Sequence, residues 1–597
     1  MSNDKPKYGS DVMVEVLRRL GVEYVFLNPG ATLRGLHESI VNYGGNAKPE
    51  MILCTHEETA VAMAWGYYCA TGRPQVAMVH DILGLQHATM AIFSAWRNHA
   101  PILVLGGTEP LEATHRRPWI DWIQSAQVQA ELVRNYVKWD DQPMGLESAV
   151  ESLLRGYQIA MTEPRGPVYI AFDAELQEAE VPEGFALPDF SRFPTPLPPA
   201  GNAQGVRRVA EVLARSEWPV LLVEGMGGSP GGTEALRSLA ELLGAPVIAV
   251  GPAFSLSNHH PLNVTGASEE VLRDADLVVA VGVKHLEFML KKAPAEPTEF
   301  RDLPGGHGGH MRYGFQSIVR EGTPIVRIGL EDYAIRPWSE AQGRLTPADF
   351  PVLGHPPQVL QDLVQHCQGL AGGASFRRRM ENRRTRVQQL HETLARNAEV
   401  ELRERRWSTR PISTPRLAAE VWEAIKGEDW VLAHGSLSGW EQRLWDVEAD
   451  RWVAAEGGVG MGMGAAMGAA LAYRGSGKVC VNIQNDGDLL YTPGSLWTAS
   501  HYRLPMLTVM FNNRSYFQDE GHQVVLSRQR GRPTETSAVG VRLEDPATDF
   551  ATLARSFDIY AEGPIEDPDQ VAPSLQRAIQ VVKEGKPALV DTVTQGR

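Results

Sequence analysis

VCVNIQNDGD (479–488) and, after a helical pattern, MLTVMFNN (506–513) contain the strongest structural signal in this chain. Each apolar run predicts a buried strand, and each ends in polar residues: an acidic-glycine turn at Asp486-Gly487 and two carboxamides at Asn512-Asn513. An Asp and an Asn at the ends of neighbouring parallel strands supply the hard oxygen ligands that Mg²⁺ prefers. Glycine in the turn lets backbone N–H groups approach an anion at a helix start. The sequence therefore predicts a site for a diphosphate and a metal ion.

A second motif, Thr55-His56-Glu57-Glu58, lies near the start of the chain, ahead of a helical pattern of small apolar residues at 59–70. It places carboxylates at the head of a helix that is apolar on every side. Taken alone, Glu57 could simply stabilise the helix N-terminus through its charge. The distance in sequence from the metal motif leaves its role open at this point.

Together the two motifs resemble the thiamine-diphosphate (ThDP) enzymes of the acetolactate synthase, benzoylformate decarboxylase and pyruvate decarboxylase group. The signature of that group is Gly-Asp-Gly followed, after a similar interval, by Asn-Asn. The similarity covers nearly the whole chain. Its best local matches to benzoylformate decarboxylase are Asn28-Pro29-Gly30, Ala95-Trp96 with His99 and Pro101, residues 166–169, residues 457–468 and residues 496–499. Asn485 departs from the pattern, because relatives usually have Gly there.

The alternation of short apolar strands with helical patterns predicts an α/β protein built from parallel sheets covered by helices. A proline-rich segment, 182–203, predicts a linker, and the glycine-rich segment 301–314 predicts a surface loop. As the resemblance implies, we expect three doubly wound parallel-sheet domains and one helical connector. Their expected limits are 1–181 (pyrimidine-binding), 204–364 (central), 376–408 (connector) and 409–597 (diphosphate-binding).

Composition excludes several classes of protein. A chain of 597 residues is too long for one core, and a net charge of −15 argues against a nucleic-acid surface. The four cysteines have no metal-binding spacing. No apolar run reaches the roughly 18 residues of a membrane span, and residues 1–8 lack the apolar core of a signal peptide. We expect a cytoplasmic protein whose partner is a small molecule, with no nucleic acid and no membrane.

The resemblance assigns roles to the residues of both motifs. ThDP performs the difficult chemistry itself, and the protein must bind and tune it. In the family, a Glu hydrogen-bonded to the aminopyrimidine ring promotes loss of the thiazolium C2 proton; here that residue is Glu57, while Glu58 receives no role. Asp486 and Asn513 are the implied Mg²⁺ ligands, with the Ser515 backbone carbonyl as a third.

Asp488 offers a competing register for the metal motif. In that register the interval to Asn512 is shorter, and Leu489 stands where glycine belongs, so Asp486 is the better ligand. Asp488 then lies beside the diphosphate. A second negative charge is unfavourable there unless it faces the water shell of the metal or the solvent.

Other segments are expected to contact the cofactor. By resemblance they are Asn28, Pro29, Gly30, Gly435, Ser436, Leu437, Gly457, Val459, Gly487 and Asp488. Ser436 precedes a helical pattern, where hydroxyl and N–H groups can hold phosphate, although serine is also a common N-cap. Val459 occupies the position of the bulky residue that bends the cofactor, but it is smaller than the usual Leu or Met. The segment 224–228 lacks a complete dinucleotide fingerprint, and we expect an empty central domain.

Two histidines are candidates for proton transfer near neutral pH. His80 matches an active-site histidine of benzoylformate decarboxylase, and His285 is a candidate for a second one, from the central domain. Ala31 replaces a serine that contacts the substrate carboxylate in that enzyme. A structural role is the alternative for both histidines.

We expect a ThDP- and Mg²⁺-dependent enzyme that acts on a C–C bond next to a carbonyl. Decarboxylation of a 2-oxo acid is the first choice. The alternatives are carboligation of the acetolactate synthase or aldehyde-lyase type, hydrolysis of a diketone, and a non-catalytic regulatory protein with the same fold. In the family, the Glu and the metal site of one centre come from different subunits, which implies a homodimer or homotetramer.

Overall fold

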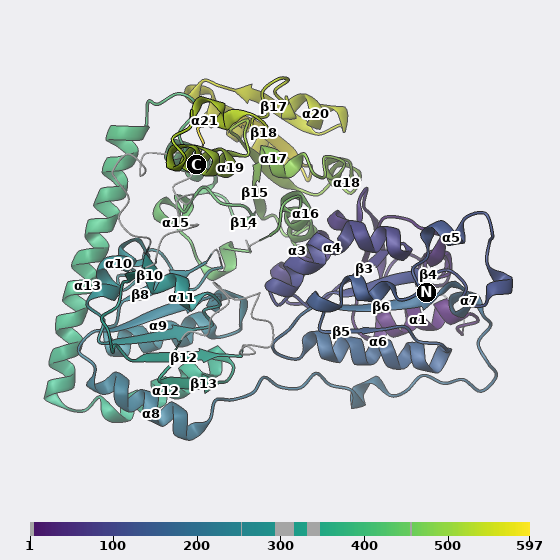
Figure 1. Cartoon of the computed structure of the whole chain (residues 1–597), viewed down its shortest axis with the longest axis horizontal. Helices are drawn as coiled ribbons and strands as arrows, with labels where there is room; N and C mark the ends of the chain where they lie inside the picture. The colour runs from purple at the N-terminus through teal and green to yellow at the C-terminus, as the bar shows by residue number, and fades with distance from the viewer. Residues whose placement is uncertain (1–4, 252, 293–315, 331–346, 454–456, 597) are drawn as a thin grey trace.

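The computed structural model of the chain describes residues 5–251, 253–292, 316–330, 347–453 and 457–596. The loop expected at 301–314 lies outside these residues. Three α/β bodies follow one another along the chain (Figure 1): the N-terminal body in purple and blue, the central body in teal, and the C-terminal body in green and yellow. The long helix α13 (Ala374–Val400) runs along one side of the molecule, from the central body to the C-terminal one.

The N-terminal sheet has six parallel strands in the order β2-β1-β3-β4-β6-β5. Its strands are β1 (Tyr24–Leu27), β2 (Glu50–Leu53), β3 (Val76–Val79), β4 (Leu103–Thr108), β5 (Trp139–Asp141) and β6 (Val168–Asp173). Its principal helices are α1 (Gly9–Arg19), α2 (Arg34–Glu38), α3 (Glu57–Thr71), α4 (Asp81–Arg97), α5 (Asp121–Gln124), α6 (Leu146–Met161) and α7 (Ala174–Glu178). β3, β4 and β6 are buried along their whole length, as expected for a sheet with helices on both faces.

The central sheet has the order β13-β12-β9-β7-β8, again with all neighbours parallel. Its strands are β7 (Pro219–Glu224), β8 (Val247–Val250), β9 (Leu277–Val281), β12 (Ile325–Gly329) and β13 (Phe350–Leu353). Its helices are α8 (Ala203–Arg215), α9 (Gly232–Leu243), α10 (Ser268–Arg273), α11 (Leu286–Met289) and α12 (Pro356–Leu370). A two-stranded antiparallel ribbon, β10 (Lys291–Lys292) with β11 (Gln316–Ser317), lies outside this sheet.

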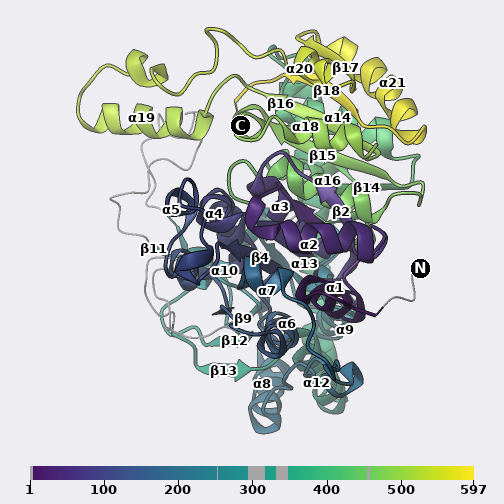
Figure 2. The same cartoon turned by 90° about the vertical axis from the view of Figure 1, so that its right-hand side faces the viewer.

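The C-terminal sheet has the order β14-β15-β16-β18-β17, with all neighbours parallel. Its strands are β14 (Trp430–His434), β15 (Val479–Asn485), β16 (Met506–Asn512), β17 (Tyr560–Ile565) and β18 (Ala588–Val593). Its helices are α14 (Thr414–Ile425), α15 (Glu441–Leu444), α16 (Gly462–Ala472), α17 (Asp486–Leu489), α18 (Ser495–His501), α19 (Phe517–Gln529), α20 (Phe550–Ser556) and α21 (Val571–Lys583). Figure 2 shows α19 extending away from the sheet.

The predicted fold class is confirmed: the three main sheets are parallel and helix-covered. The sequence reasoning missed β5, β13 and β17, each of which is an edge strand. Edge strands are only partly buried and tolerate proline, and Pro351 and Pro564 lie within two of them. Such strands lack the continuous apolar run that reveals a central strand. Among the described residues, no helix is long and apolar enough to cross a membrane.

Candidate active site

The N-terminal and C-terminal bodies meet where α3 packs along α16 (Figure 1). The helices approach closely because glycine occupies the contact on each side. A Cβ on Gly66 would lie 1.9 Å from the Ala465 carbonyl oxygen, and one on Gly468 would lie 2.1 Å from the Met63 carbonyl oxygen. This contact brings the head of α3 and the glycine-rich start of α16 together within one chain.

The two carboxylates at the head of α3 face different neighbours. Glu57 lies against α4: its Oε2 is 3.9 Å from His87 Nδ1, and a Cβ on Gly84 would lie 3.1 Å from its Oε1. Glu58 faces the C-terminal body, with its Oε1 beside Gly460 and without a hydrogen-bond partner. Burial, together with the negative charge of Asp488, raises the pKa of Glu58 to about 7. Sequence reasoning assigned Glu58 no role, yet it is the carboxylate that faces the metal-motif segment.

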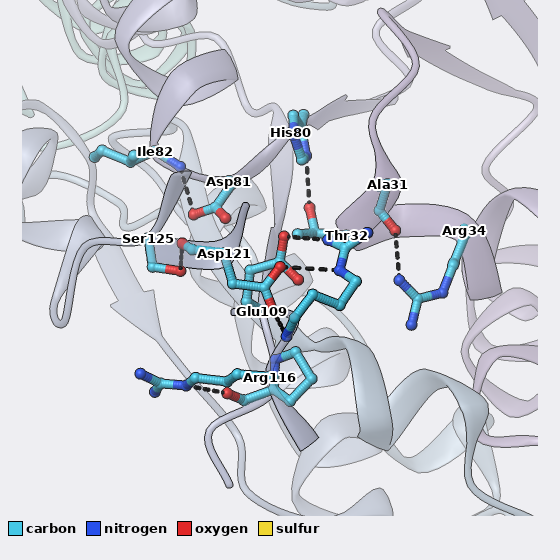
Figure 3. Close-up of polar contacts among 12 residues, drawn as sticks. Ala31, Thr32, Arg34, His80, Asp81, Ile82, Glu109, Arg116, Asp121 and Ser125 are labelled. Atoms are coloured by element: carbon cyan, nitrogen blue, oxygen red, sulfur yellow. Dashed lines mark hydrogen bonds and ion pairs between the residues drawn. The ribbon is translucent and has the colours of Figure 1, made fainter. Parts of the chain in front are cut away.

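His80 lies at the carboxyl end of β3, directly against the Asn28-Pro29-Gly30 loop. A Cβ on Gly30 would lie 2.1 Å from the His80 Cβ, so only glycine allows this approach. His80 Nδ1 and Thr32 Oγ1 are 2.8 Å apart (Figure 3). Burial lowers the pKa of His80, whereas a hydrogen bond with Gln124 and the charge of Glu57 oppose this effect. The carboxyl edge of the sheet thus holds Glu57 and His80 within electrostatic reach of one another, where ligands of open α/β sheets bind.

A buried acidic cluster lies next to His80 (Figure 3). Asp81 has a left-handed backbone (φ 47°), and its Oδ2 is buried without a hydrogen-bond partner. Burial raises the pKa of Asp81 to about 7, and the charges of Glu109 and Asp121 add to the effect. Arg117 donates to Glu109 at 2.7 Å and to Asp121 at 2.9 Å. Asp81 is therefore a protonatable group beside His80, and no sequence motif marks it.

A cavity of about 570 Å³ opens beside the Asn28-Pro29-Gly30 loop. Its lining includes Pro29, Gly30, Ala31, Arg34 and His37. Arg34 pairs with Glu178 at 2.5 Å, which balances its charge. The cavity can accept a small polar molecule next to the backbone of this loop.

The implied metal ligands converge at the carboxyl ends of β15 and β16. Asp486 Oδ1 accepts the Gly487 N–H at 2.9 Å, while its Oδ2 is buried without a hydrogen-bond partner. Burial raises the pKa of Asp486 to about 6, opposed by the N–H groups of Gly487, Arg514 and Ser515. Asn513 Oδ1 accepts the Ser515 N–H at 3.1 Å. A buried carboxylate oxygen facing the Asn513–Ser515 turn fits a hard divalent cation.

The carboxylate of Asp488 is turned toward the glycine-rich start of α16. Its carboxylate accepts the N–H groups of Gly460 at 2.6 Å and Gly462 at 3.2 Å, and the Gln484 amide at 2.6 Å. The N–H groups at the start of α16 stabilise the charge of Asp488, because helix N-termini stabilise carboxylates. The expected contact of Asp488 with the cofactor stays a prediction.

In the predicted phosphate-binding loop, residues 435–437, two donor groups already form hydrogen bonds with the carboxylate of Glu441. Ser436 Oγ donates to Glu441 at 2.7 Å, and the Leu437 N–H donates to the other carboxylate oxygen at 2.9 Å. Gly435 has φ 90°, and a Cβ there would lie 2.0 Å from the Ile483 carbonyl oxygen. The loop is thus pressed against β15, and a bound phosphate would compete with Glu441 for these donors. Sequence reasoning did not anticipate Glu441.

For the remaining predicted site residues, the structure gives their exposure and their neighbours. Gly457 is exposed, and Val459 is 51% exposed. Tyr516 covers Gly487, since a Cβ on that glycine would lie 2.6 Å from the ring. His285 is the N-cap residue of α11 in the central body. Its Nδ1 is buried without a hydrogen-bond partner, and no hydrogen bond among the described residues joins it to α3 or to the metal motif. These roles stay predictions.

Three family models match successive parts of the chain. Residues 7–132 match the N-terminal TPP-binding domain of thiamine pyrophosphate enzymes, residues 206–301 their central domain, and residues 433–592 their C-terminal TPP-binding domain. Thiamine pyrophosphate is another name for ThDP.

Individual proteins match over nearly the whole chain. A probable acetolactate synthase large subunit of Methanocaldococcus jannaschii is 23% identical, covering 98% of this chain and 91% of that protein. Benzoylformate decarboxylase of Pseudomonas aeruginosa is 25% identical, covering 92% of each. The crystal structure of benzoylformate decarboxylase from Polynucleobacter necessarius superposes with a TM-score of 0.73 at 18% identity, covering 99% of this chain and 98% of that one. Similarity at this level extends the shared fold to the whole chain.

Proposed function

Because this chain belongs to the thiamine pyrophosphate enzyme family, we propose that it is a Mg²⁺-dependent decarboxylase of a 2-oxo acid. The observation that carries the proposal is the position of His80, which contacts Gly30 and Thr32 and lies in the electrostatic field of Glu57. A decarboxylase must protonate the carbon that loses CO₂. A histidine at the carboxyl edge of the sheet is suited to that transfer near neutral pH.

Each residue of the site would have its own role in this reaction. When bound, ThDP would supply a nucleophilic carbon and a sink for the electron pair released with CO₂. Glu57, which is only 7% exposed, would hold or release a proton at the pyrimidine ring. Asp486, Asn513 and the Ser515 carbonyl would hold Mg²⁺. His80, kept in place by Thr32, would deliver the proton to the product.

Replacement of His80 tests this assignment. His80→Ala should slow aldehyde release from a 2-oxo acid by roughly 10²–10⁴-fold, the range typical of general acid–base groups. Carboligation with an added aldehyde should be spared, since that reaction needs protons kept away until the acceptor arrives. Thr32→Val is the companion variant, because it removes the Nδ1 partner while retaining the ring. Unchanged decarboxylation in His80→Ala would make His80 a structural histidine.

Carboligation of the acetolactate synthase type is the second candidate. The similarity to the M. jannaschii relative over 98% of the chain favours it, as does Ala31, which lacks the hydroxyl expected for a benzoylformate decarboxylase. A panel of 2-oxo acids with and without an aldehyde acceptor separates the two. Free aldehyde supports decarboxylation, and a 2-hydroxy ketone or 2-hydroxy-2-methyl-3-oxo acid supports ligation.

We also propose a homodimer or homotetramer. The exposed tryptophans Trp119 and Trp122 lie beside Gln124, the residue that hydrogen-bonds to His80. Their side chains are 74% and 75% exposed, an unusual amount of aromatic surface for a free face. Light scattering of the purified protein tests the assembly, and a fully active monomer would contradict it.

A further inference from the structure

Two histidines connect Glu57 to the surface. His87, on α4, and His56, the N-cap of α3, have their rings 4.9 Å apart, with His87 Nδ1 3.1 Å from His56 Nε2. His87 Nδ1 is also 3.9 Å from Glu57 Oε2. The side chain of His87 is 58% exposed, whereas that of Glu57 is only 9% exposed. In the single chain, the cluster therefore spans the distance between solvent and the buried carboxylate.

The hydrogen bonds determine which ring nitrogens carry protons. The backbone N–H of Glu58 donates to His56 Nδ1 at 3.2 Å, so in the neutral ring the proton of His56 is on Nε2. This Nε2–H then donates to His87 Nδ1, which leaves the proton of neutral His87 on its Nε2. The hydrogen bond from His56 thus orients the His87 ring so that Nδ1, the nitrogen without a proton, is the one near Glu57.

The same hydrogen bonds argue against a metal ion at this cluster, although the three side chains have suitable ligand types and lie within 4.8 Å of one another. A neutral histidine that binds a metal through Nε2 carries its proton on Nδ1. In His56 that position already accepts the Glu58 N–H. Metal binding would have to break this helix cap, and it would occupy the carboxylate that the proposed function requires.

We propose that His87, held by His56, is a proton relay between solvent and Glu57. The inference rests on the proposed role of Glu57. In the outward direction, the proton of the Glu57 carboxyl moves to His87 Nδ1 as the His56 contact opens, and the proton on His87 Nε2 leaves to water. This regenerates a Glu57 carboxylate and a neutral His87 with its proton on Nδ1, and a ring tautomerisation through solvent restores the starting state. The reverse sequence reprotonates Glu57.

The titratable groups packed around the relay are His56, Glu58 and His80. Burial lowers the pKa of His56, while the charge of Glu57 raises it and a protonated His87 lowers it. His56 therefore stays neutral and directs its N–H toward His87. Glu58 faces away, toward Gly460 and Asp488. His80 lies against Gly30 and interacts with the charge of Glu57.

The first test measures exchange of the ThDP C2–H for deuterium by NMR in the Mg²⁺-loaded protein. His87→Asn should slow exchange roughly 10²-fold in dilute buffer, at the lower end of general acid–base effects, and added imidazole should restore it. His259→Asn is the matched control, because His259 is 61% exposed and also faces a carboxylate, Asp446, at 3.5 Å. An exchange rate unchanged in His87→Asn, or a slow rate that imidazole does not restore, would overturn the relay.

The second test uses the protein without cofactor, so it does not depend on the proposed reaction. At fixed pH, Glu57→Gln should shift the NMR ring signals of His87, because the Glu57 carboxylate lies 3.9 Å from His87 Nδ1, and should leave those of His259 unchanged. An unshifted His87 would overturn the coupling. If His87 responds to Glu57→Gln but the loaded protein decarboxylates no 2-oxo acid, the relay geometry stands and the proposed function fails. Tight Zn²⁺ binding that is lost in His87→Asn would overturn the relay in favour of a metal site.

Discussion

The carboxylate of Asp488 bridges to the backbone of Gly460, whose N–H donates to it at 2.6 Å across 28 residues of sequence. A Cβ at the nearby Gly462 would lie 2.6 Å from the other carboxylate oxygen. The atypical acid in the metal motif therefore organises the glycine-rich start of α16. Without it, the N–H groups of this loop would lack their carboxylate acceptor, which is costly where they are shielded from water.

Asp488→Asn should destabilise the cofactor-free protein by about 1–3 kcal/mol, because an amide NH₂ would face the donors that now meet a carboxylate. Chemical denaturation measures the loss. Asp545→Asn, at an exposed position, is the control and should change little. If the two variants were equally stable, the hydrogen bonds of Asp488 would make no net contribution to the free energy of unfolding.

Glu58→Gln should alter the pH dependence of stability. The pKa of Glu58 is raised from 4.5 to about 7 by burial and by Asp488, so the folded protein retains a proton that the unfolded chain loses. Stability from this group is complete below about pH 4.5 and is lost as pH rises through about 7. The difference is at most about 3 kcal/mol. Relative to wild type, Glu58→Gln should gain stability between pH 5 and 8 in thermal scans, and parallel curves for the two proteins would contradict this.

Gly66→Ala should separate α3 from α16. The added methyl would meet the Ala465 carbonyl oxygen at 1.9 Å, and overpacking of this kind costs about 1–3 kcal/mol. Gly369→Ala is the matched control, since a Cβ there meets nothing within 4 Å and helix propensity favours alanine. Denaturation midpoints should fall for the first variant and hold or rise for the second. A tolerated Gly66→Ala would mean that the helices can move apart without loss.

ThDP binding should require a divalent metal, because Asp486 can meet a diphosphate only through a cation. Isothermal calorimetry should detect binding with Mg²⁺ and none in excess EDTA, and Asp486→Ala should abolish the metal-dependent heat. Equal affinity in EDTA would contradict the assignment of Asp486 as a metal ligand.

Glu57→Gln should leave the fold and ThDP binding largely intact while removing most C2 deprotonation, since a carboxamide does not share a proton with the pyrimidine ring as a carboxylate does. Calorimetry and C2–H exchange by NMR report these two properties separately. Retention of wild-type exchange would refute the role of Glu57.

The sequence by itself determined the elements that depend on local pattern. The buried runs of β15 and β16 and the polar residues after them predict a parallel sheet with a metal site at its carboxyl edge, and the structure places Asp486 opposite the Asn513–Ser515 turn. Apolar periodicity and turn chemistry act over a few residues, so they can be read from the chain directly. The edge strand β17 was not predicted, because a partly buried strand has no continuous apolar run.

Only the tertiary structure decided where the polar groups point. Glu57 and Glu58 are neighbours in sequence, yet one faces His87 and the other faces Gly460, because successive residues of a helix point in different directions and α3 packs against both α4 and α16. Likewise, the partners of Asp488 depend on N–H groups 26 and 28 residues away. The energies of buried charges depend on distances across the fold, and no pattern along the chain records these distances.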